Sequence, residues 1–122
     1  MNGIAFWFVA VAALCVTIGM GWGIQMSASG NHLLAGAHAH LNLVGWATMG
    51  LFGLYYHAVP AAAARSLAKV HFIVALAGVV LMVPGIALAI TERGEMLAVT
   101  GSLLTFASML IFLFTVATNR TA

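Results

Sequence analysis

Two closely spaced histidines lie near the start of a long apolar stretch of the chain. His38 and His40 fall within the sequence AHAHLNLVGW, which covers residues 37–46. An ionisable side chain is costly at membrane depth and marks a functional site by default. Neutral imidazole is also the commonest metal ligand in proteins. The pattern therefore indicates a haem or metal site inside a bilayer.

The composition places this site in a membrane protein. Of the 122 residues, 64% are apolar and 5% are charged, and the mean hydropathy is +1.13. Soluble domains carry about 25% charged residues, so this chain predicts an integral membrane protein in contact with the lipid bilayer. A net charge of +2 from four basic and two acidic residues gives no basic patch, which argues against a nucleic-acid partner.

The single cysteine limits how a cofactor could be attached. Cys15 cannot form an internal disulfide, and the chain has no CxxC or CxxCH motif. A haem would therefore be bound non-covalently.

Four apolar segments are expected to position the histidines. A bilayer-spanning helix needs about 20 mainly apolar residues, and turn residues separate the segments at 27–31, 60–69 and 91–95. Such short connections predict an all-α membrane protein, an antiparallel four-transmembrane-helix bundle in one domain over residues 1–122. The expected helices cover about residues 4–26, 33–59, 70–90 and 96–117.

Three details of the spans bear on their role. The first segment lacks a basic n-region and is longer than the apolar core of a signal peptide, so we expect a mature helix. Gly19 and Gly23 have the spacing that lets helices, or a flat macrocycle, approach closely. Pro84 predicts a kink in the third span.

The few charges predict the orientation in the membrane. Arg65 and Lys69 lie in the expected second connection and Arg120 near the C-terminus, whereas the third connection holds Arg93 between two glutamates. By the positive-inside rule, both termini are expected in the cytoplasm, in the inner membrane of a bacterium. His38 and His40 then lie toward the outer face.

Helical geometry separates the two histidines. At 100° per residue they differ by about 200° around a helix, so they point to nearly opposite sides. Two sites on the two flanks fit this geometry better than one shared metal ion. Asn42, one turn after His38, could hydrogen-bond His38 or a bound group.

The remaining histidines are weaker candidates. His57 lies 17 residues beyond His40, about 25 Å along a helix at 1.5 Å per residue, and His71 is expected at a similar depth. Either could be a second-choice ligand; the alternatives are an interfacial anchor at His57 and a similar structural role at His71. His32 is expected to be a solvated loop residue.

The histidine segment and the helix that follows it resemble a known pattern. The chain resembles the catalytic subunit of haem-copper oxidases, closest to the C-family (cbb-type) enzymes, over roughly residues 36–85. The motifs that carry this resemblance are His38-x-His40, Gly45-Trp46, GLYYHAVP at residues 53–60, His71-Phe72 and Gly78.

The resemblance implies roles for the two central histidines. It matches His38 to the ligand of the high-spin haem at the dioxygen site and His40 to the ligand of the low-spin haem; His71 matches no haem ligand. The helices that would bring the copper ligands and the second low-spin haem ligand are missing. Oxidoreductase activity of the oxidase type is therefore an open question for this chain, and neighbouring copies would have to complete the site.

Three functions follow as hypotheses. The first is an oligomeric b-type haem protein related to oxidase subunit I, with haem between protomers and a role in electron transfer linked to a quinol, a cytochrome or a gas. The second is a copper- or other metal-binding transport or chaperone protein that uses His38, His40 and methionines. The third is a cofactor-free accessory subunit of a respiratory complex.

Overall fold

The fold is built from apolar helices. The computed structural model describes residues 1–120, and the regular secondary structure in that range is entirely helical, without strands. Three helices are long and apolar enough to cross a membrane, which confirms the predicted all-α, membrane-spanning character of the chain. These helices are α1 (Gly3–Ser29), α5 (Ser66–Ile90) and α6 (Met96–Thr118).

The histidine segment forms a composite helix. It consists of α2 (Ala35–His40), the π-helix η1 (Leu41–Thr48) and α3 (Met49–Ala58), which follow one another without a gap. The hydroxyl of Thr48 donates a 2.9 Å hydrogen bond to the carbonyl oxygen of Leu43, five residues earlier. The backbone hydrogen bonds of a π-helix also join residues five apart, and such helices often occur at functional sites. The sequence predicted an ordinary α-helix here, and the π-helix after His40 was not predicted.

The second connection is shorter than the sequence predicted. The prediction of a break over residues 60–69 is wrong, because residues 60–63 form the short helix α4 (Pro60–Ala63) and α5 already begins at Ser66. Proline at the first helical position followed by alanines favours helix formation. Lys69 and His71 therefore lie inside α5, and α5 also continues through Pro84 to its end at Ile90.

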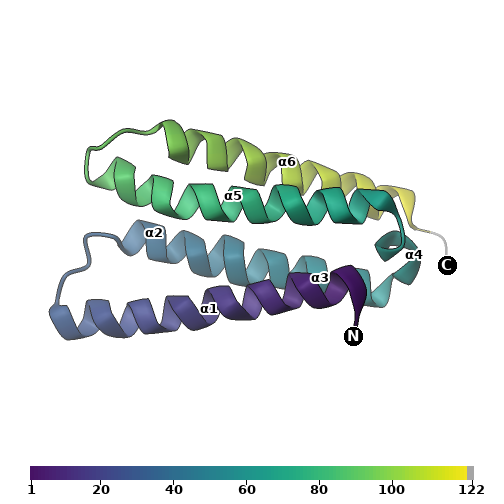
Figure 1. The fold of residues 1–122 in the computed structure, drawn as a ribbon, viewed down its shortest axis with the longest axis horizontal. Helices are drawn as coiled ribbons and strands as arrows, with labels where there is room; N and C mark the ends of the chain where they lie inside the picture. The colour runs from purple at the N-terminus through teal and green to yellow at the C-terminus, as the bar shows by residue number, and fades with distance from the viewer. Residues whose placement is uncertain (121–122) are drawn as a thin grey trace.

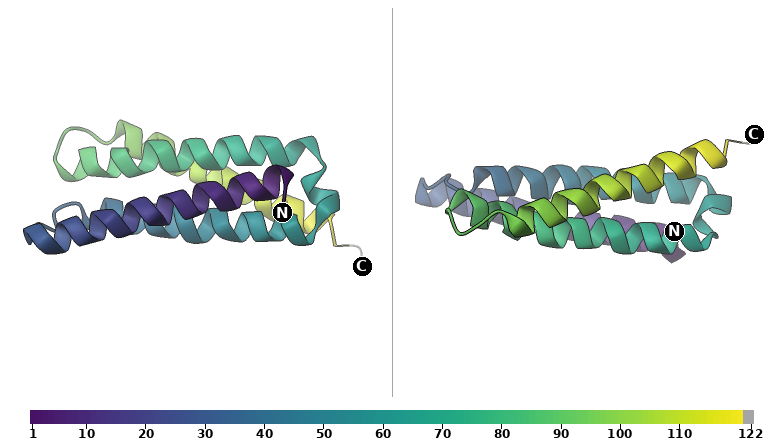
Figure 2. Two further views of the ribbon diagram at one scale, coloured as in Figure 1. Left: turned by 60° about the horizontal axis from the view of Figure 1, so that its bottom comes forward. Right: turned by 90° about the horizontal axis from the view of Figure 1, so that it is seen from above.

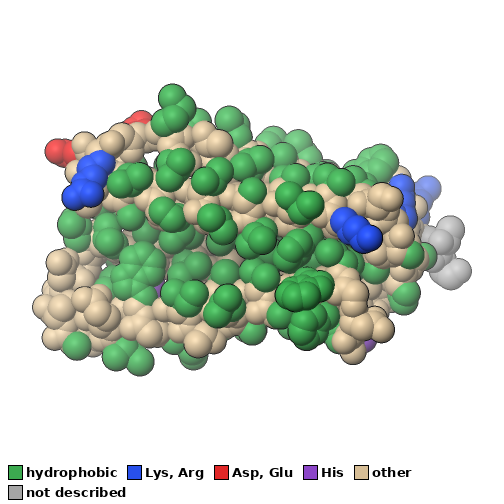
Figure 3. Space-filling view, in the orientation of Figure 1, with side chains coloured by type: hydrophobic (Ala, Val, Ile, Leu, Met, Phe, Trp, Pro, Cys, Tyr) green, Lys and Arg blue, Asp and Glu red, His purple; other side chains and the backbone are tan. Residues whose placement is uncertain are grey.

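The helices are arranged side by side in two pairs. In Figure 1 and Figure 2, α1 runs beside the α2–η1–α3 segment, and α5 runs beside α6. The N-terminus, α4 and the end of α6 lie at one end of the molecule, and the connections at 30–34 and 91–95 lie at the other. Apolar side chains are spread along the length of the face in Figure 3, with the charged side chains toward the two ends.

The close contact between α5 and α6 depends on glycine residues, which have no side chain. An added Cβ at Gly85 would fall on the backbone of Ala98, and one at Gly101 on the backbone of Met82. In lipid, such small residues allow α5 and α6 to approach closely.

An aromatic cluster joins all four helical segments. It contains Phe8 of α1, Phe52 and Tyr56 of α3, His71 of α5 and Phe112 of α6. The rings of Phe8 and Tyr56 stack with centroids 5.5 Å apart, a distance in the range of favourable aromatic pairs. The cluster lies where the two helix pairs meet and therefore fixes their relative position.

Candidate functional site

His40 has one ring nitrogen fixed and the other free. Its exposed imidazole places Nδ1 2.7 Å from the carbonyl oxygen of Gly36, one turn earlier. A carbonyl oxygen only accepts hydrogen bonds, so Nδ1 carries the proton and Nε2 keeps its lone pair. Metal-ligating histidines are oriented in this way, with the non-ligating N–H donated to a carbonyl or carboxylate.

A groove of about 420 Å³ lies beside this imidazole. It runs between the histidine segment and α6, with α5 contributing one side chain, and its volume falls within the roughly 300–1,000 Å³ of small-molecule and cofactor sites. Most of its lining is apolar. The lining residues are His40, Leu43, Val44, Thr48, Met82, Ser102, Thr105, Phe106 and Met109.

His38 turns toward α1 instead. Its Nε2 lies 2.9 Å from the carbonyl oxygen of Gly19, so this nitrogen is the donor. The indole of Trp22 stands edge-on to the imidazole, with ring centroids 5.8 Å apart. A Cβ at Gly23 would approach Nε2 to 3.3 Å. The glycines of α1 therefore make room for His38, and the two imidazoles contact different neighbours.

Asn42 belongs to the His38 side of this segment. Its Nδ2 lies 3.3 Å from His38 Nε2, and its buried Oδ1 has no hydrogen-bond partner among the described residues. An added Cβ at Gly19 would collide with this oxygen. The amide of Asn42 thus fits against α1 because residue 19 has no side chain.

His71 is enclosed in the aromatic cluster. Its imidazole is fully buried, and Nδ1 lies 2.8 Å from the hydroxyl oxygen of Tyr56. The ring centroids of Phe52 and Phe8 lie 4.4 and 5.1 Å from that of His71. Its Nε2 is buried without a partner in residues 1–120. The Tyr56–His71 pair joins residues on two helices, and no local sequence signal indicated it.

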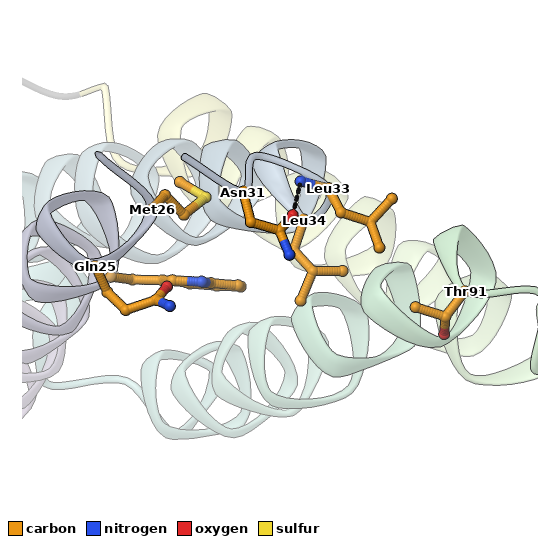
Figure 4. A pocket seen from close by; sticks show the side chains of 7 residues that line it. Gln25, Met26, Asn31, Leu33, Leu34 and Thr91 are labelled. Carbon is orange, nitrogen blue, oxygen red and sulfur yellow. Dashed lines mark hydrogen bonds between the residues drawn. The ribbon is translucent and has the colours of Figure 1, made fainter. Parts of the chain in front are cut away.

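The last two histidines lie away from the groove. His57 is exposed and lines a recess of about 420 Å³ beside the first turn of α1. His32 is exposed in the connection after α1, near a smaller recess of about 190 Å³. Figure 4 shows this smaller recess, where the Leu33 N–H donates a 3.0 Å hydrogen bond to Oδ1 of Asn31.

Histidine, cysteine, aspartate and glutamate side chains do not by themselves form a metal site in residues 1–120. No group of three or more histidine, cysteine, aspartate or glutamate side chains that could hold a metal ion occurs there. A metal ion bound at the histidines would therefore need ligands from a cofactor, or from side chains other than these four types.

The comparisons with known proteins give no relative: no protein-family model, curated protein or solved structure matches the chain.

Proposed function

We propose that this chain is a b-type haem-binding membrane protein that transfers electrons and is related to the catalytic subunit of haem-copper oxidases. The observation that carries the proposal is the imidazole of His40, with Nδ1–H bonded to the Gly36 carbonyl and Nε2 free beside an apolar groove. When bound, a haem supplies one-electron chemistry. His40 would hold the haem through Nε2, and the groove would supply the apolar surroundings that tune it.

The residues that line the groove fit a bound haem, whereas the residues around His38 do not. The Gly36 carbonyl holds the His40 ring in one orientation and increases the basicity of Nε2. His38 uses its Nε2 to donate to Gly19, on the opposite side of the segment. Ligation by His38 would require this bond to break, so the proposal depends on His40.

The proposal includes the assembly and its place in the cell. We propose four antiparallel spans in a bacterial inner membrane, with both termini cytoplasmic. The groove is open on the side that faces away from the rest of the protomer, where Leu43 and Phe106 are each 63% exposed. A second copy covering this side would place the haem between protomers and shield it from lipid. A quinol or a cytochrome would exchange electrons with it.

Substituting single histidines tests the proposal. The detergent-purified protein, supplied with haem during expression, is expected to show a Soret band that His40→Ala abolishes. His32→Ala, in the exposed loop, is the matched control and should bind haem as the wild type does. A gel-filtration profile like that of the wild type shows that His40→Ala is folded. A wild-type Soret band that persists in folded His40→Ala would overturn the assignment of His40.

A second candidate is a copper site in the same groove. The thioethers of Met82 and Met109 line the groove together with His40, and soft sulfur with imidazole suits Cu(I). Elemental analysis separates the two candidates, because copper in the absence of a Soret band supports the second.

A further inference from the structure

We infer that the His40 groove contains a second axial ligand from the same chain, the thioether of Met82. This inference rests on the proposed haem function and specifies the site further. It assigns the second ligand to the same protomer as His40 and not to a neighbouring copy.

The positions of the other histidines lead to this inference. Within residues 1–120, only His40 among the five lines the groove. His38 is bonded to Gly19 of α1, and His71 is bonded to Tyr56 inside the aromatic cluster. A bis-histidine site within one protomer would therefore require an internal contact to be broken.

The groove offers two other side chains with good haem-ligand chemistry. Met82 comes from α5 and Met109 from α6, and a methionine thioether is an established axial ligand opposite histidine. Hydroxyl groups also line the groove, but neutral hydroxyls are poor ligands for haem iron. The choice is therefore between the two thioethers.

Met82 is the better positioned of the two. It is 5% exposed, whereas Met109 is 46% exposed. Its backbone lies so close to Gly101 of α6 that a Cβ at that position would collide with it. The hydroxyl of Ser102 lies 3.6 Å from its Sδ. A ligand held by backbone contact and by a neighbouring hydroxyl loses little conformational freedom on binding.

The experiment compares Met82→Leu with Met20→Leu, a change at an exposed methionine of α1 outside the groove, in the haem-loaded protein. Both changes nearly conserve volume, so folding is expected to be retained. A methionine ligand raises the reduction potential. Met82→Leu should therefore lower the potential and open one axial position, seen as a larger carbon monoxide difference spectrum, while Met20→Leu should leave both unchanged.

The outcomes distinguish this inference from the proposed function. A haem-loaded wild type whose potential and carbon monoxide spectrum are unaffected by Met82→Leu would overturn the inference while leaving the haem proposal in place. The same measurements on Met109→Leu cover the other thioether of the groove, and an effect of this change without one of Met82→Leu would overturn the inference in favour of the exposed thioether. A wild type that binds no haem defeats the proposed function itself, and the inference with it.

Discussion

At the scale of single residues, the hydrogen bonds to the ring nitrogens give the histidines different chemical roles. His40 donates to its own helix and keeps Nε2 free, whereas His38 donates from Nε2 to α1. His71 is bonded to Tyr56 and enclosed by aromatic rings. Sequence spacing predicted different directions for His38 and His40, but it could not show which nitrogen of each ring is free.

The Tyr56–His71 bond is expected to stabilise the fold. Tyr56→Phe removes the hydroxyl that lies 2.8 Å from His71 Nδ1 and leaves that nitrogen buried and unpaired. We expect the free energy of unfolding in detergent to fall by about 0.5–2 kcal/mol, the usual range for such bonds between membrane helices.

Tyr55→Phe is the matched control for this prediction. The Tyr55 ring contacts the aromatic cluster, with its centroid 5.2 Å from that of Phe112, but no side-chain hydrogen bond of its hydroxyl occurs in the described part of the chain. Equal losses in Tyr55→Phe and Tyr56→Phe would show that the hydrogen bond contributes nothing specific.

At the scale of elements, the contact between α5 and α6 depends on glycines. Gly85→Ala would place a methyl group on the backbone of Ala98. Because backbone cannot move aside as a flexible side chain can, we expect a loss of about 1–3 kcal/mol in the free energy of unfolding, as for overpacked cores. Thermal or denaturant unfolding in detergent measures it.

Gly21→Ala provides the comparison on an open helix surface. A Cβ at Gly21 meets nothing within 4 Å, and alanine in a helix interior is favoured over glycine by roughly 0.5–1 kcal/mol. Gly21→Ala should therefore be neutral or slightly stabilising. If Gly85→Ala behaves in the same way, the close approach of the two helices is not as described.

The helical spans could be predicted from hydropathy, but their internal details could not. Long apolar runs predicted α1, α5 and α6 to within a few residues, because burial in lipid requires about 20 apolar residues whatever the tertiary contacts. The π-helix at Leu41–Thr48 carries the side-chain bond from Thr48 to Leu43 and packs against α1. Nothing in the local sequence distinguishes it from an α-helix.

At the scale of the whole molecule, the two ends differ in charge and in connections. The end with α4 carries Arg65, and Lys69 follows in the first turn of α5; the opposite end carries Arg93 between Glu92 and Glu95. The N-terminus and the end of α6 lie with α4 in Figure 1. The positive-inside rule therefore predicts that the α4 end faces the cytoplasm.

Cysteine labelling tests this orientation. In a Cys15→Ala background, Ala64→Cys and Ser29→Cys place single exposed thiols at opposite ends of the molecule. A membrane-impermeant maleimide added to intact cells should label Ser29→Cys, and Ala64→Cys only after the membrane is permeabilised. The reverse pattern would contradict cytoplasmic termini, and labelling of both sites in intact cells would contradict the four-span topology.

The groove could be foreseen from the sequence only in part. His40, Leu43 and Val44 share a helix face that periodicity predicts, but Ser102, Thr105 and Met109 join them through the packing of α6 against α5. Contacts between residues so far apart in the chain arise from tertiary structure, so neither the groove nor its methionines followed from the histidine motif alone.

The most direct test of the haem proposal is an optical spectrum of the detergent-purified wild type, oxidised and then reduced with dithionite. The account predicts a Soret band that shifts on reduction and sharp α and β bands typical of six-coordinate haem b. A protein that folds normally and shows no Soret band, even after haem is supplied, would contradict it.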